Sequence, residues 1–213
     1  MSPEKLAQKI DVRVRNWAKG RDKLVVAIDG YTGIGKTTLL GALTALNSDI
    51  LPVNRDDFVF SREIVAKKLA KAKDKSRVWE LEVCDDRKLK KIIDAFQKKN
   101  SSSYLVDTYN GISGEVDIPK IFAVTKKIMV IECGFMFHPE FSLSALWDRR
   151  IYLSGDLAKI DKRRVRREKE KWGKDYFPET HPDSYLRQVI IGLKRYAKLY
   201  RPETIADLVV SVD

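Results

Sequence analysis

The chain has few of the residues on which disulfide frameworks, zinc sites and nucleophilic catalysis depend. Its 213 residues include two cysteines, Cys84 and Cys133, and two histidines, His138 and His181. Two cysteines so far apart indicate neither a disulfide framework nor a zinc site, and they fit a reducing compartment. Each histidine precedes a proline, which favours loop positions. No Ser/His/Asp or Cys/His catalytic set is apparent, and Cys133 is best interpreted as a small buried hydrophobic residue.

Long apolar segments are also missing from the sequence. No run approaches the ~18 apolar residues of a membrane helix, and residues 1–20 lack the apolar core of a signal peptide. There is no internal repeat and no low-complexity tract. We therefore expect a cytoplasmic protein with no membrane partner, folded as one domain over residues 1–213.

Acidic residues are outnumbered by basic ones. The chain has 41 Lys and Arg against 30 Asp and Glu, a net charge of +11 and a pI of about 9.5. Such a surface attracts polyanions, which include nucleoside triphosphates and nucleic acid. The densest basic block covers residues 159–174.

One motif dominates what is present. Residues 30–37 match G-x-x-x-x-G-K-[ST], the phosphate-binding P-loop, between an apolar run (24–28) and a segment of helical composition (37–46). This order predicts a strand, a loop that cradles phosphate, and a helix N-terminus that favours the anion. The expected nucleotide contacts are Gly30, Tyr31, Thr32, Gly33, Ile34, Gly35, Lys36, Thr37 and Thr38.

Two further predicted strands end in carboxylates. Residues 50–53 lead to Asp56 and Asp57, and residues 127–132 end in Glu132 as a Walker B strand does. A carboxylate beside the P-loop can accept the proton of an attacking hydroxyl, and Thr37, Asp56 and Glu132 are the expected Mg²⁺ ligands. The alternative is that Asp56 or Asp57 caps a helix beginning near residue 61.

The basic block allows three interpretations. Four arginines fall within five residues, at 163, 164, 166 and 167. They could belong to a solvated helix, to a lid that closes over the γ-phosphate, or to a nucleic-acid-binding surface. Because Trp172 is the one aromatic residue in the block that could stack on a base, we favour a lid, over about residues 156–175.

The remaining segments predict a small insert and two more strands. The insert covers about residues 76–119 and contains an antiparallel piece, with a strand at 104–109 and a tight Asn110-Gly111 turn. Residues 150–153 and 205–210 read as strands. A last helix is expected to begin at Asp183.

In this order, the motifs resemble those of the uridine kinase/phosphoribulokinase family of P-loop kinases, which includes nicotinamide riboside kinases and bacterial pantothenate kinases. The similarity covers nearly the whole chain after residue 23. Residues 29–38 resemble I-D-G-x-x-G-x-G-K-T-T, 56–58 resemble D-x-F, and 132–134 resemble the Walker B E-G. Residues 163–168 are similar to the lid string R-R-x-x-R-D, and 206–210 to A-D-V-V-I.

This resemblance implies an α/β fold: a P-loop NTPase three-layer sandwich with a parallel sheet, a small insert and a helical lid. It implies ATP and Mg²⁺ as cofactors and Asp56 as the general base. Lys36, Arg164 and Arg167 would act on the transferred phosphoryl group, with Arg163 also binding the nucleotide. The residues implied at the acceptor are Asp56, Phe58, Glu80, Asp86 and Tyr109.

The expected activity is transfer of the ATP γ-phosphoryl group to a hydroxyl of a small metabolite, with a nucleoside favoured. Pantothenate, nicotinamide riboside and a sugar phosphate are alternative acceptors, since Gly114 stands where uridine kinases carry a histidine and Trp172-Gly173-Lys174 replaces a second lid motif, R-G-R. A different alternative is an ATP-binding regulatory or nucleic-acid-binding protein. No N-K-x-D string points to GTP, and a homo-oligomer is left open.

Overall fold

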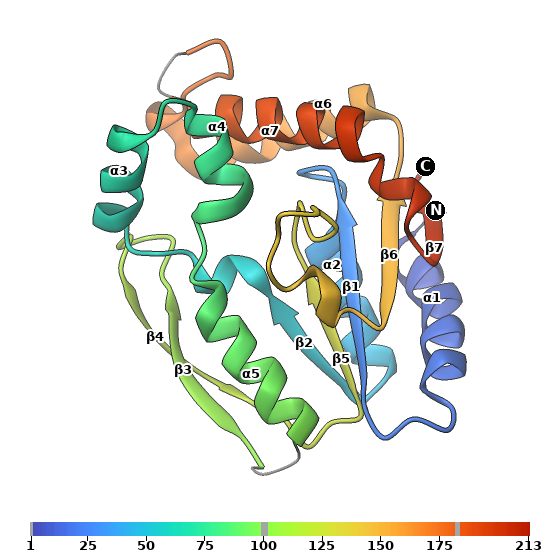
Figure 1. Cartoon of the computed structure of the whole chain (residues 1–213). Coiled ribbons are helices and arrows are strands. Elements are labelled where there is room, and N and C mark those ends of the chain that lie inside the picture. The colour runs from blue at the N-terminus through green and yellow to red at the C-terminus, as the bar shows by residue number, and fades with distance from the viewer. Residues whose placement is uncertain (1, 99–101, 182–183) are drawn as a thin grey trace.

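The computed structural model describes residues 2–98, 102–181 and 184–213. Its centre is a five-stranded parallel sheet in the order β2-β5-β1-β6-β7, and a separate two-stranded antiparallel sheet pairs β3 with β4 (Figure 1). This is the α/β architecture with a parallel sheet that the sequence predicted.

The strands of the two sheets are β1 (Leu24–Gly30), β2 (Ile50–Asn54), β3 (Tyr104–Tyr109), β4 (Val116–Phe122), β5 (Ile128–Glu132), β6 (Arg149–Ser154) and β7 (Leu208–Ser211). The α-helices are α1 (Pro3–Ala18), α2 (Lys36–Leu46), α3 (Arg62–Lys71), α4 (Lys75–Arg77), α5 (Asp86–Lys98), α6 (Leu157–Trp172) and α7 (Tyr185–Tyr200). Short 3₁₀ or π turns are η1 (Arg55–Phe58), η2 (Val78–Glu82), η3 (Ser144–Leu146), η4 (Gly173–Asp175) and η5 (Pro202–Thr204).

The core lies between the sheet and the helices on its two faces. Every residue of β1 and β5 is buried, as expected of central strands in a parallel sheet covered on both sides. In Figure 1, α2 lies behind these strands and α5 lies in front of the sheet. The β1–β5 register pairs Leu24 with Ile128 and Ile28 with Glu132, so both strands end at one edge. Helices α6 and α7 cross over this edge.

Three local predictions need correction or qualification. The β3–β4 turn is longer than an Asn110-Gly111 hairpin turn: Asn110 closes it through backbone hydrogen bonds with Gly114 and Glu115. The last strand begins at Leu208 because the chain from Pro202 first forms the turn η5. The last helix is described from Tyr185, and its predicted start at Asp183 lies outside the described residues.

In the part of the chain that the structure describes, no helix combines the length and apolar character needed to cross a membrane.

Candidate functional site

A cavity of about 780 Å³ opens at the carboxyl edge of the parallel sheet. Several parts of the chain line it. They are the loop and helix after β1, the η1 segment after β2, the residues after β5, helices α3, α6 and α7, the turn η2 with the residues that follow it, and the end of β3. Parallel α/β sheets bind ligands at this edge.

The loop between β1 and α2 has the backbone shape that a phosphate cradle requires. Gly33 and Gly35 have positive φ angles of 79° and 108°, which glycine adopts without strain. At Gly30 the constraint is space, since a Cβ atom there would lie 2.9 Å from the Leu153 carbonyl oxygen. Thr32, Gly33 and residues 35–38 line the cavity, whereas Gly30, Tyr31 and Ile34 lie behind it.

The loop is joined to the end of β5 by polar contacts. Lys36 Nζ donates to the carbonyl oxygens of Gly30 and Tyr31 at 2.9 and 3.1 Å, so the ammonium lies within the loop. Thr37 Oγ1 donates to Glu132 Oε1 at 2.7 Å. Burial raises the pKa of Glu132, against the opposing effects of Lys36 and Thr37. The P-loop and the Walker B carboxylate therefore meet as the sequence suggested.

Asp56 stands at the cavity's surface on the turn η1. Its backbone N–H is capped by Asn54 Oδ1 at 2.9 Å, and its carboxylate accepts from Cys133 Sγ at 3.3 Å. Helix α3 takes Ser61 as its N-cap residue and receives no side-chain cap. The helix-capping interpretation is therefore wrong. Cys133 is only partly buried and lines the cavity, so it is not a simple core residue.

The oxygens at this edge fit a hard divalent cation. Thr37, Glu132 and Asp56 all line the cavity and offer only oxygen atoms, which Mg²⁺ prefers over nitrogen or sulfur. Within the described ranges, no group of three or more His, Cys, Asp or Glu residues is arranged to hold a metal by itself. Such a site depends on phosphate oxygens to complete it, as magnesium sites in nucleotide enzymes do.

The basic segment forms helix α6, but its arginines differ in position. Arg164 is buried, and its guanidinium pairs with Asp161 and Glu179 while its aliphatic part packs on Gly33. Arg163 is exposed and does not line the cavity. Neither arginine lines the cavity here, and the predicted contact of each with the nucleotide stays a prediction.

Arg167 is the arginine of α6 that does line the cavity. It pairs with the neighbouring Glu168 at 3.1 Å. Glu168 is buried and also accepts from Trp172 Nε1 at 2.9 Å and from the Tyr185 hydroxyl at 3.1 Å. Burial raises the pKa of Glu168, but these hydrogen bonds outweigh it and lower the pKa overall. Helix α6 is thus tied to the start of α7 beside the cavity.

Three residues expected at the acceptor are placed elsewhere. Phe58 is buried and stacks on Phe122, with ring centroids 6.0 Å apart. Asp86 forms a bidentate ion pair with the buried Arg55, at 2.8 and 2.9 Å. None of Phe58, Asp86 or Glu80 lines the cavity, whereas Tyr109 does.

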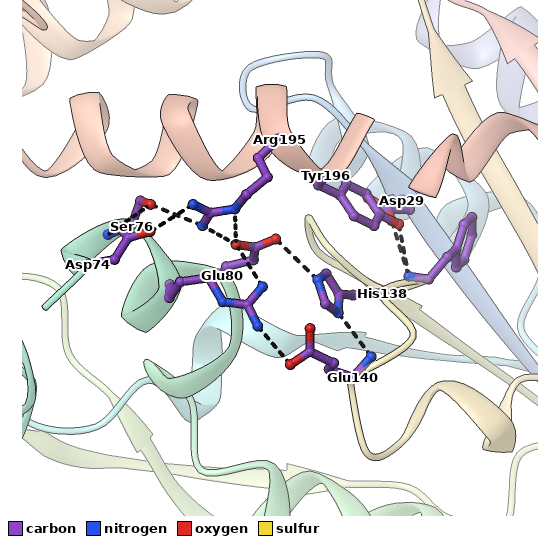
Figure 2. Close-up of polar contacts among 10 residues, drawn as sticks. Asp29, Asp74, Ser76, Glu80, His138, Glu140, Arg195 and Tyr196 are labelled. Carbon is purple, nitrogen blue, oxygen red and sulfur yellow. Dashed lines mark hydrogen bonds and ion pairs between the residues drawn. The ribbon is translucent and has the colours of Figure 1, made fainter. Parts of the chain in front are cut away.

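Glu80 lies in a buried polar network (Figure 2). Its carboxylate pairs with Arg195 of α7, with Arg77 at 3.4 Å, and with His138 Nε2 at 3.2 Å. Its expected contact with an acceptor is therefore corrected to a structural one. Spacing along the chain gave no sign of partners as distant as Arg195.

Further residues of the site were missed by the sequence analysis. Asp29, immediately before the P-loop, is buried and accepts a hydrogen bond of 2.6 Å from the Tyr196 hydroxyl (Figure 2). Arg62 and Trp79 line the cavity. Of these, Trp79 did have a sequence signal, because Trp79-Glu80 resembles the family's aromatic–acid segment at the acceptor, and Trp79 is partly buried beside the buried Glu80.

Comparison with known proteins gives similarity at the level of structure. No protein-family model and no curated protein matches the sequence. Among solved structures, a possible uridine kinase from Bacillus stearothermophilus is similar with a TM-score of 0.67 and 17% identity, over 96% of this chain and 98% of that one. D-glycerate 3-kinase from Cryptococcus neoformans gives 0.61 and 14%, over 90% and 86%. Phosphoribulokinase from Rhodobacter spheroides gives 0.58 and 12%, over 89% and 70%.

These similarities establish the fold. The chain has the three-layer α/β fold of P-loop kinases of the uridine kinase and phosphoribulokinase type, which confirms the predicted fold class and, at the level of fold, the resemblance seen in the sequence.

Proposed function

We propose that the protein transfers the γ-phosphoryl group of ATP to a hydroxyl of a small molecule. The observation that carries this proposal is the meeting of Lys36, Thr37, Asp56 and Glu132 around one cavity. A P-loop alone would fit any nucleotide-binding protein. A separate carboxylate on the cavity wall is what an acceptor hydroxyl requires.

In this reaction the acceptor oxygen attacks the γ-phosphorus, and the bond from that phosphorus to the β–γ bridging oxygen breaks. The hydroxyl proton passes to Asp56, and ADP leaves with the bridging electron pair. Lys36 and the loop N–H groups would hold the phosphates, and Arg167 would face the charge on the moving group. Most of the acceleration would come from positioning and electrostatics, because phosphoryl transfer needs little covalent help.

Thr37 and Glu132, with Asp56 nearby, would hold a magnesium ion, which when bound neutralises charge on the phosphate oxygens. The hydrogen bond between Thr37 and Glu132 already aligns two oxygens for that role.

The lid role of residues 156–175 is part of the same proposal. Helix α6 spans most of this segment and lies over the P-loop, with Arg164 packed on Gly33. Closure there would exclude water that otherwise consumes the triphosphate. A nucleoside is the acceptor that the sequence resemblance favours.

The test is ATP consumption by the purified protein across a panel of nucleosides and small alcohols, with the product mass measured directly. Asp56→Asn is expected to lower turnover by ~10²-fold or more while ATP still binds, because the base is lost and the phosphate cradle is not. Asp49→Asn is the matched control, since Asp49 is exposed at the opposite end of β2. Unchanged turnover in Asp56→Asn, or ATP hydrolysis without any phosphorylated acceptor, would overturn the proposal.

A further inference from the structure

Arg62 differs from the other arginines that line the cavity. Arg55 is held by Asp86 and Arg167 pairs with Glu168. The side chain of Arg62 is exposed, and no carboxylate of the described residues forms an ion pair with it. A guanidinium carries several donors in a planar fork that fits carboxylate and phosphate groups. Arg62 is therefore available to an anion that enters the cavity.

The β3–β4 turn fixes the place of this arginine. The Arg62 backbone N–H donates to the Gly114 carbonyl oxygen at 2.7 Å. The guanidinium lies so close to Gly114 that a Cβ atom there would be 2.7 Å from Nε. Gly114 also has a positive φ of 82°, which side chains disfavour. The glycine thus leaves room for the guanidinium against the turn.

The wall around Arg62 has a consistent chemical character. Away from the P-loop it is mostly apolar, and its side chains come from α3, from η2 and the residue after it, and from α7: Val65, Ala66, Leu69, Trp79, Val83, Leu186 and Val189. Trp79 also packs on Tyr185, with ring centroids 5.6 Å apart. The carboxylate of Asp57 on the same wall is bound by Lys120 at 2.6 Å, so it does not neutralise Arg62. A ligand that uses this wall would have an apolar body and an anionic group.

The geometry points to Arg62 as the specificity-determining residue of the acceptor site: it binds a carboxylate or phosphate group of an alcohol whose body packs on the apolar wall. This inference rests on the proposed phosphoryl transfer, which supplies the acceptor. It favours a charged acceptor over an uncharged nucleoside. The anion would contact Arg62, the first residue of α3, while the hydroxyl reaches Asp56 on the preceding turn η1.

The experiment uses matched pairs of charged and neutral alcohols. The pairs are pantothenate and panthenol, glycerate and glycerol, and ribulose 5-phosphate and ribulose, with uridine as a further neutral compound. Binding is measured by calorimetry to the full chain loaded with a non-hydrolysable ATP analogue and Mg²⁺, so that no turnover is needed. At least one charged member is expected to bind more tightly than its neutral partner. Arg62→Ala is expected to weaken only the charged member, by about 10- to 100-fold.

Two further variants distinguish recognition of the ligand's negative charge from an effect on folding. Arg62→Lys keeps a charge and is expected to retain part of the preference. Gly114→Ala places a methyl group against the guanidinium and is expected to reproduce the effect of Arg62→Ala. Gly20→Ala is its control, because Gly20 also has a positive φ, 71°, but no atom lies within 4 Å of an added Cβ. Arg13→Ala, on the exposed face of α1, controls for the loss of one positive charge.

The outcomes distinguish this inference from the proposed function. If no charged member binds more tightly than its partner, or if Arg62→Ala weakens both members equally, the inference is wrong. A loss of affinity for the ATP analogue alone in Arg62→Ala would assign the residue to the nucleotide and would also overturn it. If charge-selective binding depends on Arg62 but no compound is phosphorylated, the anion site stands and the kinase proposal fails.

Discussion

At the scale of single residues, the surroundings of His138 disfavour its protonated form. It is buried, its Nδ1 accepts from the Glu140 backbone N–H at 3.0 Å, and its Nε2 therefore carries the proton that faces Glu80. Burial lowers the pKa of His138 below its ordinary value of 6.5, although Glu80 and Glu140 act in the opposite direction and Arg77 in the same one. The folded protein thus binds this proton less readily than the unfolded chain does.

The free energy of unfolding is consequently expected to fall as pH decreases below His138's ordinary pKa of 6.5. One proton taken up on unfolding gives a slope of at most about 1.4 kcal/mol per pH unit. His138→Asn keeps an acceptor for Glu140 and removes the titrating ring, so it is expected to flatten this slope. Urea denaturation between about pH 5 and pH 8 measures it.

The control for this prediction is His181→Asn, which removes the other histidine of the chain. If both variants keep the wild-type slope, His138 does not titrate on unfolding. The comparison uses only the slope with pH. The pH-independent loss of stability in His138→Asn is set aside, because the His138 ring also packs on Tyr196 and Tyr200.

Some contacts of single residues at the site could be predicted from the sequence, and others could not. Lys36 and Thr37 belong to a motif whose spacing sets their geometry, and Glu132 ends a strand whose neighbour is β1, so their meeting follows from local patterns and parallel pairing. The partners of Glu80 and Arg164 depend on α7 and on Glu179, which no spacing rule relates to them. Long-range ion pairs form once the fold has brought the elements together.

At the scale of elements, α6 and α7 are joined through one buried carboxylate. Glu168 accepts from Trp172 on its own helix and from Tyr185 at the start of α7, and it pairs with Arg167. Tyr185 in turn packs on Trp79 of the cavity wall. An acceptor that moves Trp79 would therefore act on the helix that carries Arg167.

Glu168→Gln is expected to loosen α6. The amide keeps one acceptor oxygen but directs an NH₂ group toward donors, which leaves a buried donor unpaired at a cost of about 1–3 kcal/mol. Hydrogen exchange should accelerate over the amides of α6 and not over β1 or β5. Glu170→Gln is the matched control, because Glu170 is exposed and lies 3.7 Å from Arg166. Equal exchange of α6 in the two variants would contradict the coupling.

Regular elements were predicted more accurately from the sequence than irregular ones. Fully buried strands such as β1 and β5 were identified within a residue or two, because burial on both faces requires a nearly continuous apolar run. The π turn η2 and the long β3–β4 turn were missed, since both depend on contacts with other elements. Those two irregular pieces carry Trp79, which lines the cavity, and Gly114, which lies against the Arg62 guanidinium.

At the scale of the whole molecule, part of the net charge of +11 lies along α6, where several basic side chains are paired with carboxylates. Arg164, Arg166 and Arg167 each pair with a carboxylate of the same helix, and Arg164 also pairs with Glu179 beyond it. Phosphate-backbone binding needs cationic side chains that can pair with phosphates and so release the counterions condensed on the nucleic acid. The pairing of these three arginines makes α6 a weaker candidate for a nucleic-acid surface than its charge alone suggests.

A nucleotide bound in the cavity would bind the folded chain and not the unfolded one, so it should stabilise the whole domain. For a ligand at 100 times its Kd the expected gain is about 2.7 kcal/mol in the free energy of unfolding. Lys36→Ala should lose this gain with an ATP analogue and Mg²⁺ and should also abolish phosphoryl transfer, because its ammonium lies within the loop that would hold the phosphates.

Thermal denaturation with and without the analogue measures the effect, and Lys9→Ala on the exposed face of α1 is the control. An equal gain in Lys36→Ala and in the control would mean that the nucleotide binds away from the P-loop. Replacing the analogue with a short RNA or DNA duplex tests the nucleic-acid alternative in the same assay. If the duplex stabilises both variants, and does so less as salt is raised, the basic surface outside the cavity carries the function instead.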